Sequence, residues 1–209
     1  MDFKNISLGK KYILFFLSFI PVIIILLIIM LRNVVNPSNQ EIINRVKNIE
    51  CYTSDVEYIF KNERSEFKEE TTQYYSRSLG SRIEFKGGYE PVKVYKGGEI
   101  KVEGSNNEEF ILERDIDELY PLAFVENILD NPVTEEIKEV REEWGDGEYI
   151  EVCVEYNNKN KHLNKAKFYI DKNKRVPALL KIIDDNDKER VRILFKNFKI
   201  EKSLDSSLF

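Results

Sequence analysis

Side chains that could carry out nucleophilic or acid–base chemistry are few in this 209-residue sequence. The single histidine, His162, lies in the polar segment NNKNKHLNK, where a histidine is normally solvated. A Ser-His-Asp or Cys-His site needs a nucleophile, a base and an orienting group in mutual reach, so either site would depend on this one residue. We therefore expect no enzyme activity of these kinds.

Pairs of neighbouring carboxylates recur at Asp115 and Asp117, at Glu142 and Glu143, and at Asp184 and Asp185. A glycosidase needs two carboxylates that face each other across a cleft about 5 to 10 Å wide, whereas adjacent acids in turns usually form a solvated surface. The segment DDNDKE lacks the alternating ligands and the central glycine of an EF-hand calcium loop. The sequence thus predicts no catalytic residues, no metal site and no cofactor.

Glycine-rich and basic segments do not predict a phosphate or nucleic-acid site either. KGG occurs at Lys86 and at Lys96, but a phosphate-binding loop needs a longer glycine-rich frame that ends in lysine at a helix start. Basic and apolar residues alternate along 190–196, as expected of a strand with one face in water. Residues 33–209 carry 28 Lys and Arg against 36 Asp and Glu, and this net charge of −8 opposes nucleic-acid binding.

Aromatic residues are the most informative side chains for binding, because the chain has 13 Phe, 11 Tyr and 1 Trp. Such rings can line a concave apolar surface for an acyl chain, a peptide or a protein partner. The candidates for an apolar groove or partner surface are Tyr58, Phe60, Tyr74, Phe85, Tyr95 and Trp144. Ordinary core packing explains the same residues equally well.

Cys51 and Cys153 are the two cysteines, and neither belongs to a CxxC motif or to a metal-ligand spacing. A disulfide between them would survive in a domain outside the cytoplasm. We favour two small buried hydrophobic residues, because the sequence does not place the two Cα atoms within bridging distance.

The elements that position these residues begin with an apolar run. Ile13 to Leu31 is nineteen residues without a charge, which is long enough to cross a bilayer core of roughly 30 Å as a helix. A cleaved signal peptide would have a shorter apolar region that ends in small residues. Pro21 is no objection, because membrane helices tolerate proline. The sequence therefore predicts an uncleaved transmembrane signal anchor over 13–31.

The charges around this run predict its orientation. Lys10 and Lys11 precede it and Arg32 follows it, and together with Lys4 this bias predicts a cytoplasmic N-terminus over residues 1–12. A linker over 32–39 would then lead to a domain over 40–209 on the outer side of the membrane. The expected protein is a single-pass membrane protein.

The domain itself reads as a meander of short strands. Ser38 is a candidate N-cap for a short amphipathic helix, and an apolar alternation of period two follows from Cys51. Expected strands cover 51–61, 67–75, 82–85, 91–95, 99–103, 109–113, a hairpin around 145–147, and then 165–171, 177–184 and 190–200. A helical segment over 115–131, divided by Pro121, interrupts the meander. The apolar phase slips at Asn197, which predicts a β-bulge.

The C-terminal third carries a family resemblance. The segment FYIDKNKRVPALLKIIDDNDKERVRILFKNFKI has Ile170-Asp171 before a turn, Pro177 at the next strand and an acidic turn at 184–187, and DSSLF closes the chain. This pattern resembles the final strands of the LolA-like lipoprotein-carrier fold, and within it the clostridial spore-germination lipoprotein GerS and its relatives. The resemblance implies an antiparallel half-barrel wrapped around a helical segment.

The resemblance also implies a function. GerS-like proteins are non-catalytic partners of the spore-cortex amidase CwlD, so the hypothesis is a membrane-anchored partner or activator of a cortex amidase in sporulation or germination. The chain departs from the family because its first cysteine, Cys51, comes too late to accept a lipid. The alternative hypothesis is a LolA-like domain that binds a lipid or a lipoprotein, or that senses the envelope. The Lys-, Ile- and Asn-rich composition is typical of a low-GC Firmicute.

Overall fold

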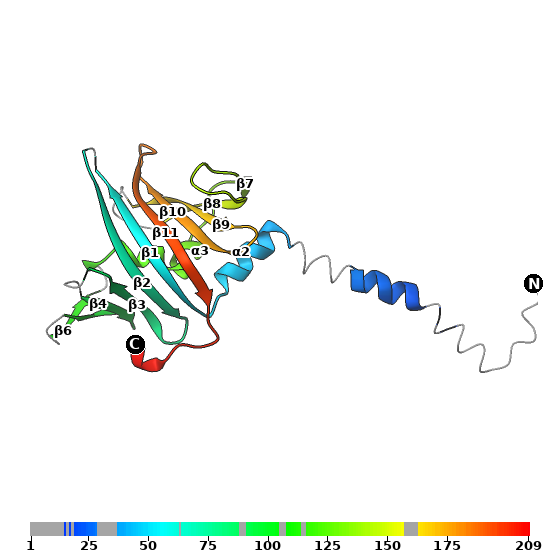
Figure 1. Ribbon diagram of the computed structural model, residues 1–209, viewed down its shortest axis with the longest axis horizontal. Helices are drawn as coiled ribbons and strands as arrows, with labels where there is room; N and C mark the ends of the chain where they lie inside the picture. Colours follow the sequence, from blue (N-terminus) through cyan, green and yellow to red (C-terminus); the bar gives the residue numbers. More distant parts are fainter. Residues whose placement is uncertain are drawn as a thin grey trace, which may run out of the picture. The chain divides into compact units, whose positions relative to one another are not determined.

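The structure is a computed structural model that describes residues 15, 17, 19–28, 37–62, 64–87, 91–104, 108–113, 116–156 and 163–209. It divides into two compact units, Met1–Glu41 and Ile42–Phe209. The larger unit holds the sheet that Figure 1 shows in ribbon form. All the side chains discussed as a site lie in this larger unit.

The predicted transmembrane helix and the single-pass location are wrong. Among the described residues, no helix is both long enough and apolar enough to span a bilayer. Pro21 lies in the described helical run 19–28. Lys10, Lys11, Ile13, Leu31 and Arg32, the other residues of the predicted anchor, lie outside the described residues.

One antiparallel sheet of eleven strands dominates the described part of the chain. The strands are β1 (Cys51–Lys61), β2 (Glu66–Ser76), β3 (Gly80–Phe85), β4 (Val92–Lys96), β5 (Glu99–Glu103), β6 (Glu109–Glu113), β7 (Lys138–Val140), β8 (Tyr149–Glu155), β9 (Lys165–Asp171), β10 (Val176–Ile183) and β11 (Glu189–Ile200). Their order is β6-β5-β4-β3-β2-β1-β11-β10-β9-β8-β7. The sheet therefore joins two meanders through one long-range pairing, β1 with β11, and leaves β6 and β7 at its ends.

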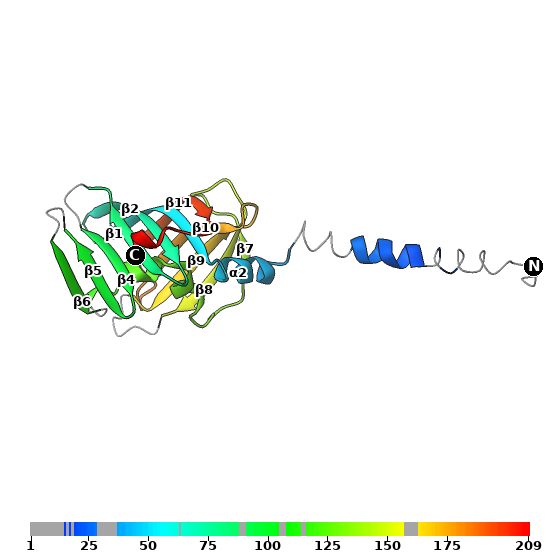
Figure 2. The ribbon, with the colours of Figure 1, turned by 90° about the horizontal axis from the view of Figure 1, so that it is seen from below.

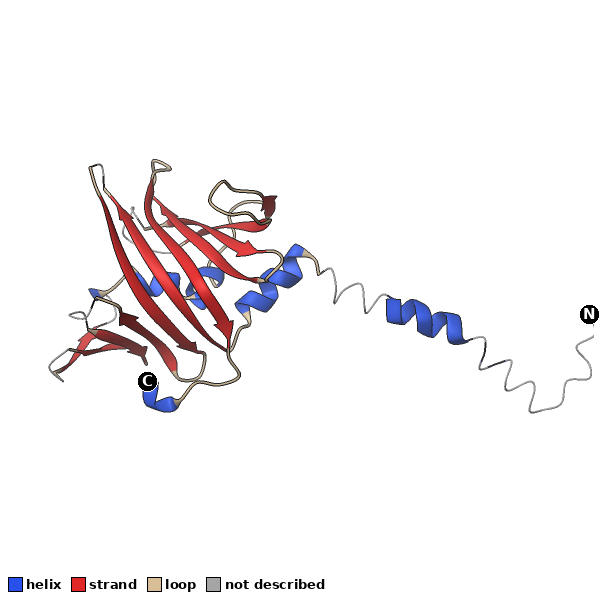
Figure 3. Ribbon diagram, in the orientation of Figure 1, coloured by secondary structure: helices blue, strands red, loops and turns tan. Residues whose placement is uncertain are grey.

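The sheet is curled, and short helices lie on its hollow side (Figures 2 and 3). These helices are η3 (Tyr120–Ala123) and α3 (Val125–Leu129), and α2 (Asn39–Lys47) adds Ile42, Ile43 and Val46 to the same core. Phe124, Val125 and Ile128 are almost completely buried against the strands. The hollow of the sheet is therefore filled by the chain itself.

The boundaries of these helices follow from local chemistry. Ser38 and Glu41 form a reciprocal capping box at the start of α2, with Ser38 N–H donating to Glu41 Oε2 at 2.8 Å and Glu41 N–H to Ser38 Oγ at 3.3 Å. Pro121 falls at the start of η3, and the extended Phe124 separates η3 from α3. The predicted division of this segment into two helical pieces is confirmed, but the break lies at Phe124 and not at Pro121. Pro121 instead starts η3, because proline fits a first helical turn but not a helix interior.

The β-bulge predicted at Asn197 is confirmed. The β1–β11 register moves from Thr53 opposite Lys199 to Asp55 opposite Lys196, so two residues of β11 oppose Ser54 alone. Asn197 has a φ of 50°, the left-handed conformation that asparagine adopts more readily than most residues. The bulge lets both Phe195 and Phe198 pack on the core side.

Candidate functional site

The six aromatic residues that the sequence singles out divide between the two faces of the sheet. Tyr58, Phe60, Phe85 and Tyr95 pack on the hollow side, within or against the main core. Tyr74 follows the inward-facing Gln73 and precedes the inward-facing Tyr75, and its hydroxyl donates to Glu84 Oε2 at 3.4 Å on the outer side. Trp144 belongs to a separate outer cluster. The six residues therefore do not line one groove.

The outer cluster consists of Trp144, Tyr149, Tyr169 and Leu179, together with Val140, Ala178 and Leu194. Trp144 stacks at a tilt on Tyr149, with ring centroids 4.4 Å apart, and meets Tyr169 edge-on at 5.5 Å. The indole N–H donates to Glu142 Oε2 at 3.1 Å, which fixes the ring. The loop between β7 and β8 thereby covers the outer face of β8, β9 and β10.

The inner site forms where the β4 strand meets the segment before η3. Asp117 Oδ2 accepts hydrogen bonds from Lys93 Nζ and from Tyr95 Oη, both at 2.7 Å. The Lys93 ammonium also lies 4.4 Å from the centroid of the Tyr120 ring. Since Lys93 and Tyr95 alternate along β4, they project to the same inner face. Their shared partner, Asp117, fastens the helical segment to the sheet.

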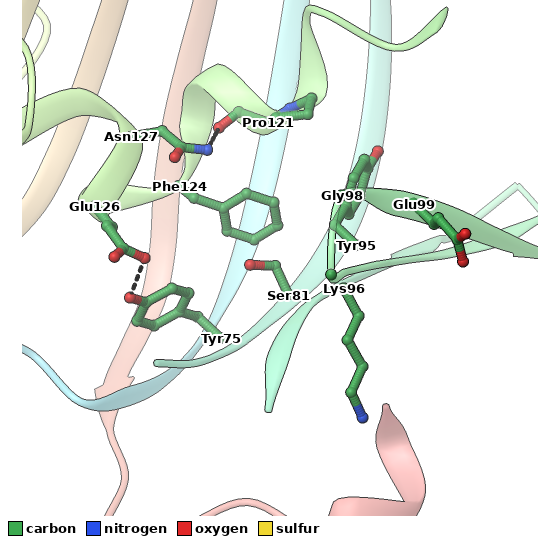
Figure 4. Close-up of a pocket in the computed structure, with 11 residues that line it drawn as sticks. Tyr75, Ser81, Tyr95, Lys96, Gly98, Glu99, Pro121, Phe124, Glu126 and Asn127 are labelled. Atoms are coloured by element: carbon green, nitrogen blue, oxygen red, sulfur yellow. Dashed lines mark hydrogen bonds between the residues drawn. The ribbon is translucent and has the colours of Figure 1, made fainter. Parts of the chain in front are cut away.

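A second set of bonds fastens α3 in the same way. Tyr75 Oη donates to Glu126 Oε2 at 2.5 Å, and Asn127 Nδ2 donates to Pro121 O at 2.7 Å (Figure 4). Phe124 projects between these groups and Tyr95, with its ring centroid 6.0 Å from that of Tyr95. Deeper in the core, Tyr58 Oη accepts from Gln73 Nε2 at 2.8 Å.

Burial keeps these tyrosines protonated. Desolvation raises the pKa of Tyr95 well above its ordinary value, and the neighbouring Asp117 carboxylate raises it further. Desolvation likewise raises the pKa of Tyr75, and its hydrogen bond to Glu126 adds to the effect. A tyrosine that stays neutral donates a hydrogen bond to a fixed acceptor but does not act as a general base near pH 7. The network is therefore structural in character.

The pocket beside this network is small. It has a volume of about 100 Å³, and Tyr75, Tyr95, Phe124 and Glu126 are among the residues that line it. Pockets for drug-sized ligands usually measure about 300 to 1,000 Å³. The pocket can hold a few water molecules, but it is too small for an acyl chain.

The remaining candidate chemistry is dispersed. Among the described residues, no group of His, Cys, Asp or Glu has the arrangement of a metal site. His162 and Asp115 lie outside the described residues. Asp184, in the acidic turn, is held by the backbone N–H groups of Asn186 and Lys188 at 2.9 and 3.0 Å and by Arg190. Its carboxylate closes a hairpin turn.

Cys51 and Cys153 are free, buried thiols. Cys51 begins β1 and Cys153 lies in β8, and β11, β10 and β9 lie between these strands. Four strand spacings correspond to about 19 Å along the sheet, whereas a disulfide needs Cα atoms within about 7 Å. Burial raises the pKa of the Cys153 thiol to about 11, so this sulfur stays protonated and unreactive near pH 7.

Sequence reasoning missed the residues that form the inner network. Lys93, Asp117, Gln73 and Glu126 are ordinary polar residues in the sequence, and only the fold brings them under the aromatic rings. One signal was available, because Lys93 interrupts the apolar alternation of its strand beside Tyr95. An inward-facing lysine requires an acidic partner.

Comparison with protein families gives one match that covers most of the chain. The model of the family described as sporulation protein YdcC-like matches residues 10–209. A search of the curated proteins finds no match.

Several solved structures are similar to this chain. An uncharacterized conserved protein from Thermus thermophilus shares 17% identity at a TM-score of 0.53, covering 81% of this chain and 91% of that chain. A LolA superfamily protein from Nitrosomonas europaea shares 9% identity at a TM-score of 0.45, covering 81% and 96%. The structure of the CwlD amidase from Clostridioides difficile in complex with the GerS lipoprotein gives 15% identity and a TM-score of 0.45, covering 96% and 100%. The Thermus protein shows that the curled sheet is a fold found elsewhere.

Proposed function

The chain belongs to the sporulation protein YdcC-like family, and from this premise we propose that it is a non-catalytic binding protein that acts on a peptidoglycan amidase of the spore cortex. Its work in sporulation or germination would be to hold or activate that enzyme. The proposal has two parts, a protein partner and the identity of that partner as an amidase, and each part rests on different support.

The filled hollow of the sheet is the observation that carries the first part. Phe124 and Ile128 are at most 1% exposed on the hollow side. The Asp117 carboxylate there is engaged within the chain, since it bonds to Lys93 and Tyr95. Because the helical segment fills the hollow and the pocket beside it measures only about 100 Å³, we place binding on the outer surface and the ends of the sheet. An outer sheet surface and open strand edges are suited to binding a protein partner.

The amidase part rests on sequence resemblance and family. The motifs of the C-terminal third, including Pro177, the acidic turn and the closing Asp205 with Leu208-Phe209, resemble those of GerS-like proteins. GerS itself has been solved in complex with the CwlD amidase. A sporulation family fits a partner that works on the cortex.

A lipid or lipoprotein carrier is the alternative with less support. A bound acyl chain would need an apolar tunnel through the hollow side, where η3 and α3 now pack. Opening that space would break the bonds of Asp117 and Glu126 and would expose Phe124. A carrier would therefore unpack its own core in each cycle, at a considerable cost in free energy.

Co-purification from sporulating cells tests the proposal. The full chain should carry its tag at the N-terminus, because Arg82 Nη1 holds the Leu208 carbonyl near the other end at 3.0 Å. We expect a cortex amidase in the eluate, and a cortex defect in a deletion strain that matches loss of that amidase. Recovery of no amidase together with a normal cortex would refute the amidase role, and bound lipid in mass spectra of the purified chain would favour the carrier.

A further inference from the structure

The β6 strand forms one end of the sheet (Figures 1 and 2). Its five residues, Glu109–Glu113, pair in an unbroken antiparallel register with β5 alone. Alternate N–H and C=O groups along the other edge of β6 have no strand beside them in the described part of the chain. An unpaired edge of this kind is a template for another strand.

β6 exposes a large apolar side chain on each of its faces. Phe110 is 52% exposed and Ile111 is 71% exposed, and successive residues of a strand point to opposite faces. Natural edge strands are normally protected by lysine, proline, a bulge or extreme shortness. The other end of the sheet is protected in this way, since β7 has only three residues and begins with Lys138 and Glu139. β6 has no lysine, proline or bulge, and its only charged residues are the glutamates at its two ends.

Glutamates surround the apolar centre of β6. Glu109 and Glu113 end the strand, and Glu103 and Glu99 lie directly opposite them on β5. Lys101 bridges Glu103 at 3.3 Å and Glu109 at 2.9 Å, whereas Glu113 has no ion-pair partner among the described residues. This end of the sheet therefore carries excess negative charge.

The same charges disfavour a second copy of the chain. In an antiparallel β6–β6 pairing centred on Ile111, Glu109 of each copy would face Glu113 of the other. Like charges directly opposite each other destabilise a strand pair. A strand with basic residues four apart, on either side of an apolar centre, would instead place a cation opposite each glutamate.

We propose that β6 is a docking edge for an extended segment of a protein partner, with apolar residues at its centre and Lys or Arg at both ends. This inference rests on the proposed function and adds to it the surface and the chemistry of the contact. The partner segment adds antiparallel to β6 and covers Phe110 and Ile111. Backbone hydrogen bonds supply affinity and the glutamates supply selectivity.

Labelled peptides with the full chain test this edge directly. The probe TKVIVKT matches the spacing of Glu109 and Glu113, and TEVIVET is its charge-reversed control. In fluorescence anisotropy at low salt, we expect TKVIVKT to bind about tenfold more tightly than TEVIVET. The reason is that the two attractive pairs with Glu109 and Glu113 become two repulsive pairs in the control peptide. The double variant Glu109→Lys with Glu113→Lys should reverse this preference. The matched variant Glu136→Lys with Glu143→Lys, which makes the same charge change at exposed sites elsewhere, should keep it.

Backbone pairing has its own control. Two further probes carry N-methyl groups on alternate residues, so that each blocks one edge of the peptide, and we expect one of the two to lose binding. Equal binding of both methylated probes, or a preference that the β6 variant leaves unchanged, would overturn the inference. A concentration-dependent dimer abolished by Ile111→Lys would overturn it too, in favour of a second copy.

The outcome is separable from that of the proposed function. If an amidase still co-purifies with the Glu109→Lys and Glu113→Lys variant in undiminished yield, the docking edge fails and the binding function stands. If the peptides behave as expected but no amidase is recovered with the native chain, the edge stands and the amidase role fails. Circular dichroism melting of every variant shows that each is folded.

Discussion

Asn197 Nδ2 donates a hydrogen bond to Asp55 Oδ2 at 2.8 Å, across the step where β1 and β11 change register. Asp55 also accepts from Lys86 Nζ at 2.6 Å and from Thr72 Oγ1 at 3.2 Å, so one carboxylate joins β11 to β2 and to the end of β3. These bonds lower the pKa of Asp55, with the one from Asn197 contributing most. The bulge and this carboxylate together fix the centre of the sheet.

Substitution of Asn197 separates backbone strain from the lost bond. Asn197→Val places a β-branched residue at a φ of 50°, and we expect it to lower the free energy of unfolding by about 2 kcal/mol. Asn197→Gly loses the bond to Asp55 but accepts the conformation, so its effect should be less than about 1 kcal/mol. Urea unfolding measures both values. Equal losses in the two variants would show that the left-handed backbone carries no strain.

Removal of Asp117 should loosen the helical segment from the sheet. Asp117→Ala leaves Lys93, which is 19% exposed, without its carboxylate, and we expect a loss of about 2 kcal/mol in the free energy of unfolding. The double variant Lys93→Met with Asp117→Leu should recover more than half of this loss, because it removes both charges. Lys138→Ala, which breaks an exposed ion pair with Glu135, is the control and should leave the midpoint of urea unfolding unchanged. A double variant as unstable as Asp117→Ala would contradict this account.

Gly145 is required by the outer aromatic cluster. A Cβ at this position would lie 2.0 Å from Tyr149 Oη and 2.9 Å from Cζ of the same ring. Tyr149 is only 7% exposed and packs on Trp144, so it has little room to move. We expect Gly145→Ala to cost about 1 to 2 kcal/mol and to shift the emission of Trp144 to longer wavelength. Trp144 is the only tryptophan in the chain, so its fluorescence reports on this cluster alone.

Gly147→Ala is the matched control for that experiment. It lies in the same loop, but its added Cβ would be 3.4 Å from Tyr149, which a small adjustment accommodates. We expect near-native fluorescence and stability. The packing argument would be wrong if the two alanine variants behaved alike.

Much of the larger unit could be predicted from local pattern. Period-two alternation, turn residues and the phase slip at Asn197 are local signals, and they correspond to observed strands, turns and a bulge. Pro121 marks the start of η3, whereas the break between the two helical pieces lies at Phe124. The pairing of β1 with β11 could not be read in this way, because it joins segments some 140 residues apart. The apolar run over 13–31 led to a wrong prediction of a transmembrane helix, because hydropathy shows how long a candidate helix could be but not that the helix forms.

The site was harder to predict than the strands. Trp144 lies in a loop, where alternation does not apply, so its packing on the outer face had no local signal. Tyr74 and Tyr75 are neighbours in β2, and successive residues of a strand point to opposite faces of the sheet. Only the register of the strand therefore decides which of the two rings faces outward and which faces the core. The bonds of Asp117 to Lys93 and Tyr95 depend on how the helical segment crosses the sheet. That crossing is a tertiary property.

Asp184 should make the free energy of unfolding depend on pH in the acidic range. The backbone N–H of Lys188 is the largest cause that lowers the pKa of this carboxyl, and the Arg190 guanidinium and the Asn186 N–H lower it further. Since the folded pKa is below the unfolded value of about 3.9, the ionised group stabilises the fold at pH values above that value. This stabilisation is lost as the pH falls through the folded pKa.

The variant Asp184→Asn tests this dependence. We expect it to be less stable than the native chain at pH 7, with a difference that shrinks steadily as the pH is lowered from about 5 to about 2. Asp146→Asn makes the same chemical change at an exposed loop carboxylate and should show no such convergence. Urea unfolding at four pH values across this range gives both curves. A difference for Asp184→Asn that stays constant with pH would mean that shape, and not charge, makes this aspartate necessary for the turn.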